Sequence, residues 1–250
     1  MKDEISPIDY IMKKAIVIGA SSGIGEGMAR LLASNGYLVG ITGRRGELLN
    51  KIASEYPGKM VVKVFDNTDF DNLEKNIGEL VESLGGLDLL FLSSGTGQRN
   101  PDLEYKYEKM TIDVNVNAFA IIAVWSYRFF EKQGYGHFLS VSSVAGTRGN
   151  RFAPSYSATK AFQMSFMEGL IQKSYSSKAK IYITDVRPGY VDTAMGHGEG
   201  SFWIAPVEKT CKQIYKRAVL NRHNVVYVTK RWRLVAFLFR YVPTFIYKRL

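Results

Sequence analysis

Seven short apolar runs, separated by stretches with helical spacing of apolar residues, constrain the fold of this 250-residue chain more than any other feature. Runs such as "KAIVIG" (14–19) and "LDLLFLS" (87–93) are apolar on both faces, as strands are when helices cover both sides of their sheet. Strands that alternate with helices form parallel sheets. The sequence therefore predicts one doubly wound α/β domain over residues 1–229, followed by an extension at 230–250. The strands are expected at 14–19, 38–42, 60–65, 87–93, 137–142, 180–186 and 224–229.

The turn after the first predicted strand, "GASSGIG" (19–25), is rich in glycine and leads into a helix. Glycine lets the backbone approach a pyrophosphate closely, and the helix N-terminus offers amide donors and the positive end of its dipole. Many turns need a glycine, but at the end of the first strand of a parallel sheet this pattern is typical of a Rossmann-type nucleotide site. The predicted contacts are Gly19, Ser21, Ser22, Gly23, Ile24 and Gly25.

The end of the second predicted strand, "ITGRRGE" (41–47), indicates which dinucleotide is preferred. A site for NAD(H) places an acidic residue there for the ribose 2′-hydroxyl, whereas arginine suits the 2′-phosphate of NADP(H). Here Arg44 and Arg45 precede the first acid, Glu47. A guanidinium can pair with phosphate through two hydrogen bonds, so we expect NADP(H) over NAD(H). The alternative is that both arginines are solvated at the start of the next helix.

Tyr156 and Lys160 in "YSATK" lie four positions apart, and therefore on the same face of a predicted helix. An ammonium held near a phenol favours the phenolate and lowers a pKa that starts near ~10. A phenol with a pKa closer to neutrality transfers protons more efficiently. Taken alone, the pair is more typical of a surface tyrosine beside a solvated lysine.

With the glycine-rich turn in front and "YSATK" after the fifth predicted strand, the sequence resembles the short-chain dehydrogenase/reductase family from residue 14 to about 195. Ser143 in "VSSVAG" matches the family's catalytic serine, and Asn115 in "IDVNVNAF" matches its helix asparagine. The resemblance implies that Tyr156 exchanges a proton with a carbonyl oxygen to which Ser143 donates a hydrogen bond. It also implies that Lys160 holds the nicotinamide ribose, and that Asn115 holds a water linking Lys160 to solvent.

Further cofactor contacts follow from the same resemblance. Asp66 in "VFDNTD" matches an adenine-contacting aspartate, and "RPGYVDT" (187–193) matches the segment that closes over the nicotinamide. In one departure, "LSSG" (92–95) stands where the family usually has Asn-Asn-Ala-Gly, which keeps the glycine and removes two amide side chains. The cofactor contacts implied in this way are Asp66, Asn67, Gly95, Tyr156, Lys160, Pro188, Gly189, Val191 and Thr193.

The resemblance places the substrate over the nicotinamide, between the loop 96–105 and the segment 194–206. The second segment is rich in glycine and contains Phe202 and Trp203, which is typical of a mobile lid with an apolar wall. No Lys or Arg lies between 190 and 207, so a small carboxylate or phosphate has no cationic clamp there. We therefore expect an NADP(H)-dependent oxidoreductase that reduces a lipophilic or large neutral ketone.

Two other classes of function share this fold. One is a regulatory protein that binds a nucleotide without chemistry, and the complete set Ser143, Tyr156, Lys160 and Asn115 argues against it. The other is an epimerase or dehydratase, which commonly needs a larger substrate domain than 250 residues leave room for. The apolar stretches in the helices expected near 102–133 and 155–176 exceed what one sheet face needs, and by resemblance they form the interface of a homodimer or homotetramer.

Composition excludes several kinds of site. Cys211 is the single cysteine and the three histidines are scattered, so we expect neither an internal disulfide nor a bound metal. The N-terminal "MKDEISPIDYIM" is acidic and lacks the apolar core of a signal peptide. Because no run of 18 or more apolar residues occurs, no membrane-spanning helix is expected. The expected location is the cytoplasm.

The C-terminal fifth, residues 201–250, has eleven Lys and Arg against one acid and so accounts for the whole net charge of +10. At its end, "KRWRLVAFLFRYVPTFIYKRL" (230–250) has cations around an apolar run that is too short to span a bilayer. An amphipathic helical tail of this kind suits a membrane interface, here the inner face of the membrane. Packing at a dimer interface or over the substrate cleft is an equal alternative. Nucleic acid is less favoured, because the cations are interleaved with large aliphatic side chains.

Overall fold

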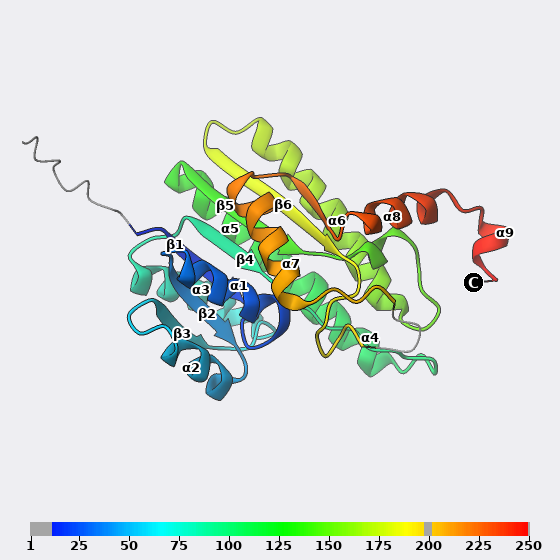
Figure 1. Cartoon of the computed structure of the whole chain (residues 1–250), viewed down its shortest axis with the longest axis horizontal. Helices are drawn as coiled ribbons and strands as arrows, with labels where there is room; N and C mark the ends of the chain where they lie inside the picture. Colours follow the sequence, from blue (N-terminus) through cyan, green and yellow to red (C-terminus); the bar gives the residue numbers. More distant parts are fainter. Residues whose placement is uncertain (1–11, 198–201, 250) are drawn as a thin grey trace, which may run out of the picture.

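The computed structural model describes residues 12–197 and 202–249, and in these residues all seven predicted strands form one parallel sheet (Figure 1). The strand order is β3-β2-β1-β4-β5-β6-β7. The chain reverses its direction across the sheet between β1 and β4, which in open α/β sheets opens a binding crevice at the carboxyl ends of the strands. The strands are β1 (Lys14–Ile18), β2 (Leu38–Gly43), β3 (Met60–Val64), β4 (Leu89–Leu92), β5 (Tyr135–Val141), β6 (Lys180–Pro188) and β7 (Val225–Val228).

Helices cover both faces of this sheet (Figure 1). One face carries α1 (Gly23–Ser34), α2 (Gly46–Ser54) and α7 (Val207–Ile214). The other face carries α3 (Phe70–Leu84), α5 (Phe119–Gln133) and α6 (Pro154–Tyr175). The remaining helical elements are α4 (Tyr105–Ile112), η1 (Asp113–Ala118), η2 (Val144–Thr147), η3 (Tyr215–Leu220), α8 (Arg231–Tyr241) and α9 (Thr244–Tyr247).

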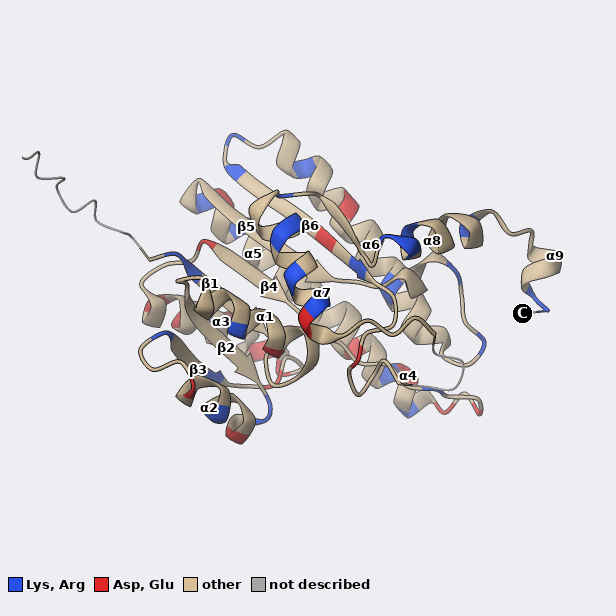
Figure 2. Cartoon of the chain, viewed as in Figure 1, with Lys and Arg blue, Asp and Glu red and all other residues tan. Residues whose placement is uncertain are grey.

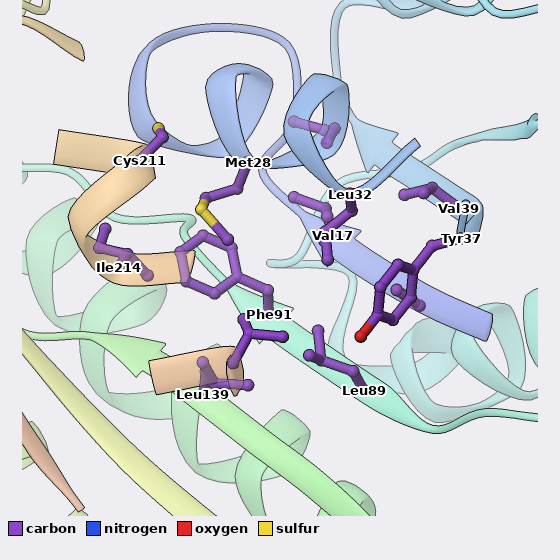
Figure 3. Close-up of a cluster of buried hydrophobic side chains, with 14 of the residues drawn as sticks. Val17, Met28, Leu32, Tyr37, Val39, Leu89, Phe91, Leu139, Cys211 and Ile214 are labelled. Carbon is purple, nitrogen blue, oxygen red and sulfur yellow. The ribbon is translucent and has the colours of Figure 1, made fainter. Parts of the chain in front are cut away.

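The strands are apolar on both faces because each face supplies a separate core. Along β1, Val17 packs under α1, whereas Ile16 and Ile18 pack under the helices of the opposite face, as the two-residue period of a strand requires. Figure 3 shows the first of these cores, where Met28 of α1 and Phe91 of β4 meet near the side chains of α7. The two cores hold the strand ends, and therefore the crevice, in a fixed place.

One continuous helical stretch, Tyr105–Gln133, is long and apolar enough to cross a membrane by length and composition. It consists of α4, η1 and α5 in succession. In the fold it lies against the sheet, where Phe119, Ile122 and Phe130 are buried. The stretch therefore has the position of a core helix. Its middle part, η1, is a π-helix, a form that is often found at functional sites.

The predicted C-terminal tail is helical and extends from the end of β7 away from the sheet (Figure 1). Only one side of α8 is anchored: Trp232 is 3% exposed, whereas Phe237 is 59% exposed. The far end of the tail touches the loop after β5, because Arg148 donates a 2.9 Å hydrogen bond to the carbonyl of Val242. The tail therefore lies beside the segment that follows Ser143 in the chain.

Candidate active site

The predicted site residues come together at the carboxyl ends of the central strands. The glycine-rich turn follows β1, Gly95 lies three residues beyond β4, and Ser143 lies two residues beyond β5. Since parallel strands end at the same edge of their sheet, these segments meet in the crevice between β1 and β4. The crevice therefore holds both the predicted nucleotide contacts and the predicted catalytic groups.

Glycine is required in the turn 19–25 because the backbone closes on itself there. A Cβ atom on Gly25 would lie 2.0 Å from the carbonyl oxygen of Gly19, and one on Gly19 would lie 2.7 Å from the amide nitrogen of Ser94. Gly23 has a φ of +60° and lies against Thr193, where a Cβ would be 2.9 Å from the threonine methyl carbon. The turn thus leaves the first amides of α1 uncovered by side chains, which fits a pyrophosphate.

Two arginines lie beside this turn, as the sequence predicts. Arg45 donates hydrogen bonds to the hydroxyls of Ser21, at 2.8 Å, and Ser22, at 2.7 Å. The guanidinium of Arg44 lies 3.7 Å from the carboxylate of Asp66, and its side chain is 73% exposed. Arg45 therefore contacts the turn itself, whereas Arg44 lies against Asp66 after β3.

Asp66 and Asn67, for which the resemblance implies cofactor contacts, follow β3. Burial raises the pKa of the Asp66 carboxyl, but hydrogen bonds from Thr68 and the charge of Arg44 outweigh it and hold the pKa below its usual value. The side chain of Asn67 donates a 2.7 Å hydrogen bond to the hydroxyl of Ser94. Ser94 thus ties the end of β4 to the end of β3.

Helix α6 is fixed at its start, in the turn that contains Tyr156. Pro154 occupies its first turn, where a missing amide hydrogen costs nothing. Glu108 of α4 accepts a 3.0 Å hydrogen bond from the amide of Ser155, which satisfies a free donor and places a negative charge at the positive end of the helix. Gly146 of η2 lies so close to α6 that a Cβ would be 2.6 Å from the backbone of Lys160. These contacts align Tyr156 with the residues after β5.

Tyr156 is partly buried, and its phenol lies near the hydroxyl of Ser143. Burial raises the pKa of its phenol, and the hydroxyl of Ser143 opposes that rise. Gly97 covers one side of the ring, since a Cβ there would be 2.2 Å from a ring carbon. Ser143 is itself fixed by a 3.1 Å hydrogen bond from the amide of Ala145. The phenol and the hydroxyl are therefore held as one unit.

Lys160 is 4% exposed, which is rare for a lysine. Its ammonium donates to the carbonyl of Val141, at 3.0 Å, and to the side-chain oxygen of Gln163, at 2.9 Å. It lies 5.9 Å from the centre of the Tyr156 ring. Burial lowers the pKa of Lys160 to about 8, and the charge of Asp185 opposes this. The group is thus a buried cation directly beside the phenol.

Asn115 is fully buried in η1. Its side chain bonds both backbone groups of Thr96, at 2.9 Å and 2.7 Å, and so fixes the loop after β4. Its backbone carbonyl accepts a 2.8 Å hydrogen bond from Gln163. Asn115 and Lys160 are therefore connected through the side chain of Gln163, whereas the resemblance implies a water held by Asn115.

Comparison with known proteins decides the family. The short chain dehydrogenase family matches residues 13–201. The chain belongs to this family. It is an NAD(P)-dependent short-chain dehydrogenase/reductase, an oxidoreductase.

Relatives of this short-chain dehydrogenase include an uncharacterized oxidoreductase of Staphylococcus aureus, 32% identical over 73% of this chain and 80% of that protein. An uncharacterized oxidoreductase of Mycobacterium tuberculosis is 31% identical over 73% of this chain and 75% of that protein. Among solved structures, a short-chain dehydrogenase/reductase from Burkholderia phymatum in complex with NAD has a TM-score of 0.81 at 17% identity, over 90% of this chain and 92% of that chain. ElxO with NADP bound has a TM-score of 0.77 at 22% identity, over 87% of this chain and 97% of that chain. At these identities the solved structures show the fold.

Aromatic side chains of the tail and of the segment after β6 pack together, and the sequence predicts this cluster only in part. The ring centre of Trp232 on α8 lies 5.2 Å from that of Phe202 and 5.7 Å from that of Tyr190. Gly189 lies under the same tryptophan, because a Cβ there would be 2.0 Å from its ring. The lid predicted over 194–206 falls partly on residues 198–201, which lie outside the described residues. The tail thus packs against the segment after β6 and against Phe202 of the predicted lid.

Sequence reasoning did not identify two residues that organise this site, Gln163 and Glu108. Gln163 gives a weak signal, because it is a polar residue on the side of α6 that also carries the buried Met167. Glu108 gives none, since its role depends on the meeting of α4 and α6 in space. Among the described residues, no cluster of three or more His, Cys, Asp or Glu side chains could hold a metal ion.

We expect the substitution Gly25→Ala to weaken NADPH binding at least tenfold, a loss of about 1.4 kcal/mol. The added carbon would lie 2.0 Å from a backbone oxygen, so the turn has to move. Fluorescence titration with NADPH measures the effect. Gly78→Ala in α3 is the control, because the added carbon meets nothing within 4 Å. Equal affinities in a folded Gly25→Ala variant and the wild type would contradict the assignment of the turn.

Proposed function

We propose that this short-chain dehydrogenase reduces a lipophilic or large neutral ketone with NADPH, and that Tyr156, Ser143, Lys160 and Asn115 form its catalytic set. The observation that carries the proposal is the buried ammonium of Lys160, 5.9 Å from the ring centre of Tyr156, with the hydroxyl of Ser143 near the phenol. Burying a cation is costly. Its presence beside a phenol is expected where the phenol must carry negative charge during a reaction.

Each residue of the site has a separate role in the reduction of a carbonyl group. The nicotinamide, when bound, supplies the hydride. Tyr156 gives its phenolic proton to the carbonyl oxygen, and the nearby ammonium of Lys160 stabilises the phenolate that remains. Ser143 donates a hydrogen bond to the same oxygen and so stabilises the charge that develops on it. Asn115 keeps the loop after β4 in place above Lys160 through Thr96.

The preference for NADP(H) rests on the two arginines beside the glycine-rich turn. Arg45 is already oriented by Ser21 and Ser22, so a bound phosphate meets a pre-organised donor. Arg44 is exposed and its weak ion pair with Asp66 can open. The further contacts proposed for the cofactor are the turn residues, Asn67, Gly95, and the segment from Pro188 to Thr193.

The aromatic boundary of the substrate region favours an apolar substrate. Tyr190, Phe202 and Trp203 are between 37% and 48% exposed and contact one another or Trp232. Large exposed aromatic side chains that gather in one place commonly mark a binding surface. No lysine or arginine occurs between 190 and 207, and the arginine that reaches this wall from the tail, Arg231, lies on the ring of Trp203 and donates to its carbonyl.

The outer faces of α5 and α6 support a homodimer or homotetramer. Trp125 and Phe129 stack on α5, with ring centres 5.1 Å apart, and are only partly buried. Phe162 and Phe166 continue the same surface on α6 and contact Phe119 of α5. A neighbouring pair of helices with a half-exposed aromatic surface suits a self-complementary interface.

The tail supports contact with an anionic membrane surface from the cytoplasmic side. On α8, Leu234, Phe237 and Leu238 are 62%, 59% and 54% exposed. Figure 2 shows Lys and Arg along α7 and α8, and Lys209, Lys216, Arg217, Lys230 and Arg231 line one groove there. A second tail would bring the same positive charge, which disfavours pairing of two tails. Anionic lipid complements the cations and accepts the apolar side chains.

For the cofactor, we expect kcat/KM with NADPH to exceed that with NADH by at least about tenfold, because one charge-assisted pair with a phosphate contributes that much. Arg44→Ala and Arg45→Ala, singly and together, should reduce the preference. Lys51→Ala on α2 is the control, since it removes a nearby exposed cation that does not touch the turn. A wild-type preference for NADH would overturn this part of the proposal.

For the chemistry, Tyr156→Phe should lower kcat by at least about 100-fold, because it removes the acid, and should leave NADPH affinity nearly unchanged. Lys160→Ala should reduce both kcat and the affinity for NADPH, and Ser143→Ala should reduce kcat alone. The rates are measured as NADPH oxidation with a panel of ketones that includes long-chain and polyprenyl-linked ones. Tyr175→Phe, at an 80% exposed position of α6, removes a hydroxyl away from the site and should keep turnover. Unchanged turnover in Tyr156→Phe would rule out the mechanism.

For the tail, full-length protein should float with liposomes that contain anionic lipid, and binding should weaken as salt increases. The double variant Phe237→Glu/Leu238→Glu should lose this binding, since both side chains are exposed and carry little of the fold. Tyr175→Glu, at an 80% exposed position of α6, is the control. If the wild type stays unbound at low salt, the tail has only a structural role.

A further inference from the structure

Gln163 is a buried amide between two members of the proposed catalytic set. It is 1% exposed and lies one turn after Lys160 on α6. Its side-chain oxygen accepts from the ammonium of Lys160 at 2.9 Å, and its side-chain nitrogen donates to the carbonyl of Asn115 at 2.8 Å. Every polar atom of this amide that faces the site therefore has a partner.

The chemistry of the partners fixes the orientation of the amide. An ammonium can only donate and a backbone carbonyl can only accept. If the amide were reversed, its nitrogen would face the ammonium of Lys160 and its oxygen would face the carbonyl of Asn115. Both contacts would then be repulsive in a buried place where unpaired polar groups are costly. The orientation in the structure is thus the one that both neighbours require.

The same contacts leave one hydrogen of the ammonium for the reaction. Of its three donors, one is taken by the carbonyl of Val141 and one by Gln163. Gly95 closes another side, since a Cβ there would be 3.4 Å from the ammonium nitrogen. The remaining N–H can therefore donate a hydrogen bond into the crevice, where the nicotinamide ribose is expected.

We propose that Gln163 is a positioning residue for the proton transfer, which holds Lys160 charged and in place beside Tyr156 and links it to Asn115 through an amide. This rests on the proposed function. Gln163 takes the place between Asn115 and Lys160 for which the family resemblance implies a water. A covalently attached amide holds the ammonium at one distance from the phenol without the cost of immobilising a water.

Other groups also act on the charge of Lys160. Tyr156 faces it from α6 itself. Asp185 of β6 favours the ammonium, but it is bound by Ser142 and by Arg187, which partly compensates its charge. Gln163 is the neutral group whose removal changes the surroundings of Lys160 without adding or deleting a charge. Its contribution can therefore be separated from that of Asp185.

The test is a pH titration of Lys160 in the full-length protein, monitored by NMR of lysine labelled with ¹³C at Cε. The Lys160→Arg variant lacks the Lys160 signal and so identifies it. We expect the Lys160 ammonium of the wild type to titrate with a pKa of about 8. Gln163→Met keeps the length of the side chain and removes the acceptor, so the pKa should fall by about one unit or more. Gln163→Glu places a carboxylate there, so the pKa should rise. Gln133→Met is the control, because it removes an amide that bonds the carbonyl of Leu87 instead.

Turnover provides a second readout. Gln163→Met should lower kcat more than it changes KM, and the basic limb of the pH profile should move in the same direction as the Lys160 pKa. Cooperative thermal unfolding shows that each variant is folded. If Gln163→Met does not fold, the shift in Gln163→Glu decides. An unchanged Lys160 pKa in the folded variants overturns the proposal. The titration needs no substrate, so failure to find a reducible ketone counts against the proposed function and leaves this result standing.

Discussion

The burial of one ammonium, that of Lys160, is the constraint on which the site depends. A lysine in this position stays charged only if acceptors replace the water that it has lost. The acceptors come from three separate elements: Val141 at the end of β5, Gln163 on α6, and at longer range Asp185 on β6. The sheet and the helix must therefore meet correctly before the cation is tolerated. The same meeting brings Ser143 to Tyr156.

The nucleotide end of the crevice depends on close backbone approach in a similar way. Gly19 and Gly25 let the turn after β1 close on itself, and Gly19 lies against Ser94 after β4. The two cores of the sheet hold these strand ends together, so the turn is shaped before any ligand arrives. Pre-organisation of this kind reduces the cost of binding. The tail adds Trp232 at the other end, where it covers Gly189.

The sequence predicts the framework well because its signals are local. All seven strands were located from their apolar runs, and the glycine-rich turn and the pair Tyr156 and Lys160 follow directly from spacing. Contacts between distant segments were not predictable in the same way. Glu108 caps α6 from another helix, and Arg45 folds back onto Ser21, because of how the elements meet. β5 begins two residues earlier than expected, since Tyr135 and Gly136 extend its pairing with β6 without continuing the apolar run.

The central claim is that Tyr156 becomes an effective acid and base only when the site is complete. In the protein without cofactor, burial raises the pKa of the Tyr156 phenol. For the phenol to act near neutral pH, the positive charge of bound NADP⁺ has to lower that pKa. The direct measurement is an ultraviolet titration of the phenol, as the difference between wild type and Tyr156→Phe, with and without NADP⁺. The account predicts that NADP⁺ lowers the Tyr156 pKa by at least about one unit. A phenol that ionises at the same pH in both states would contradict it.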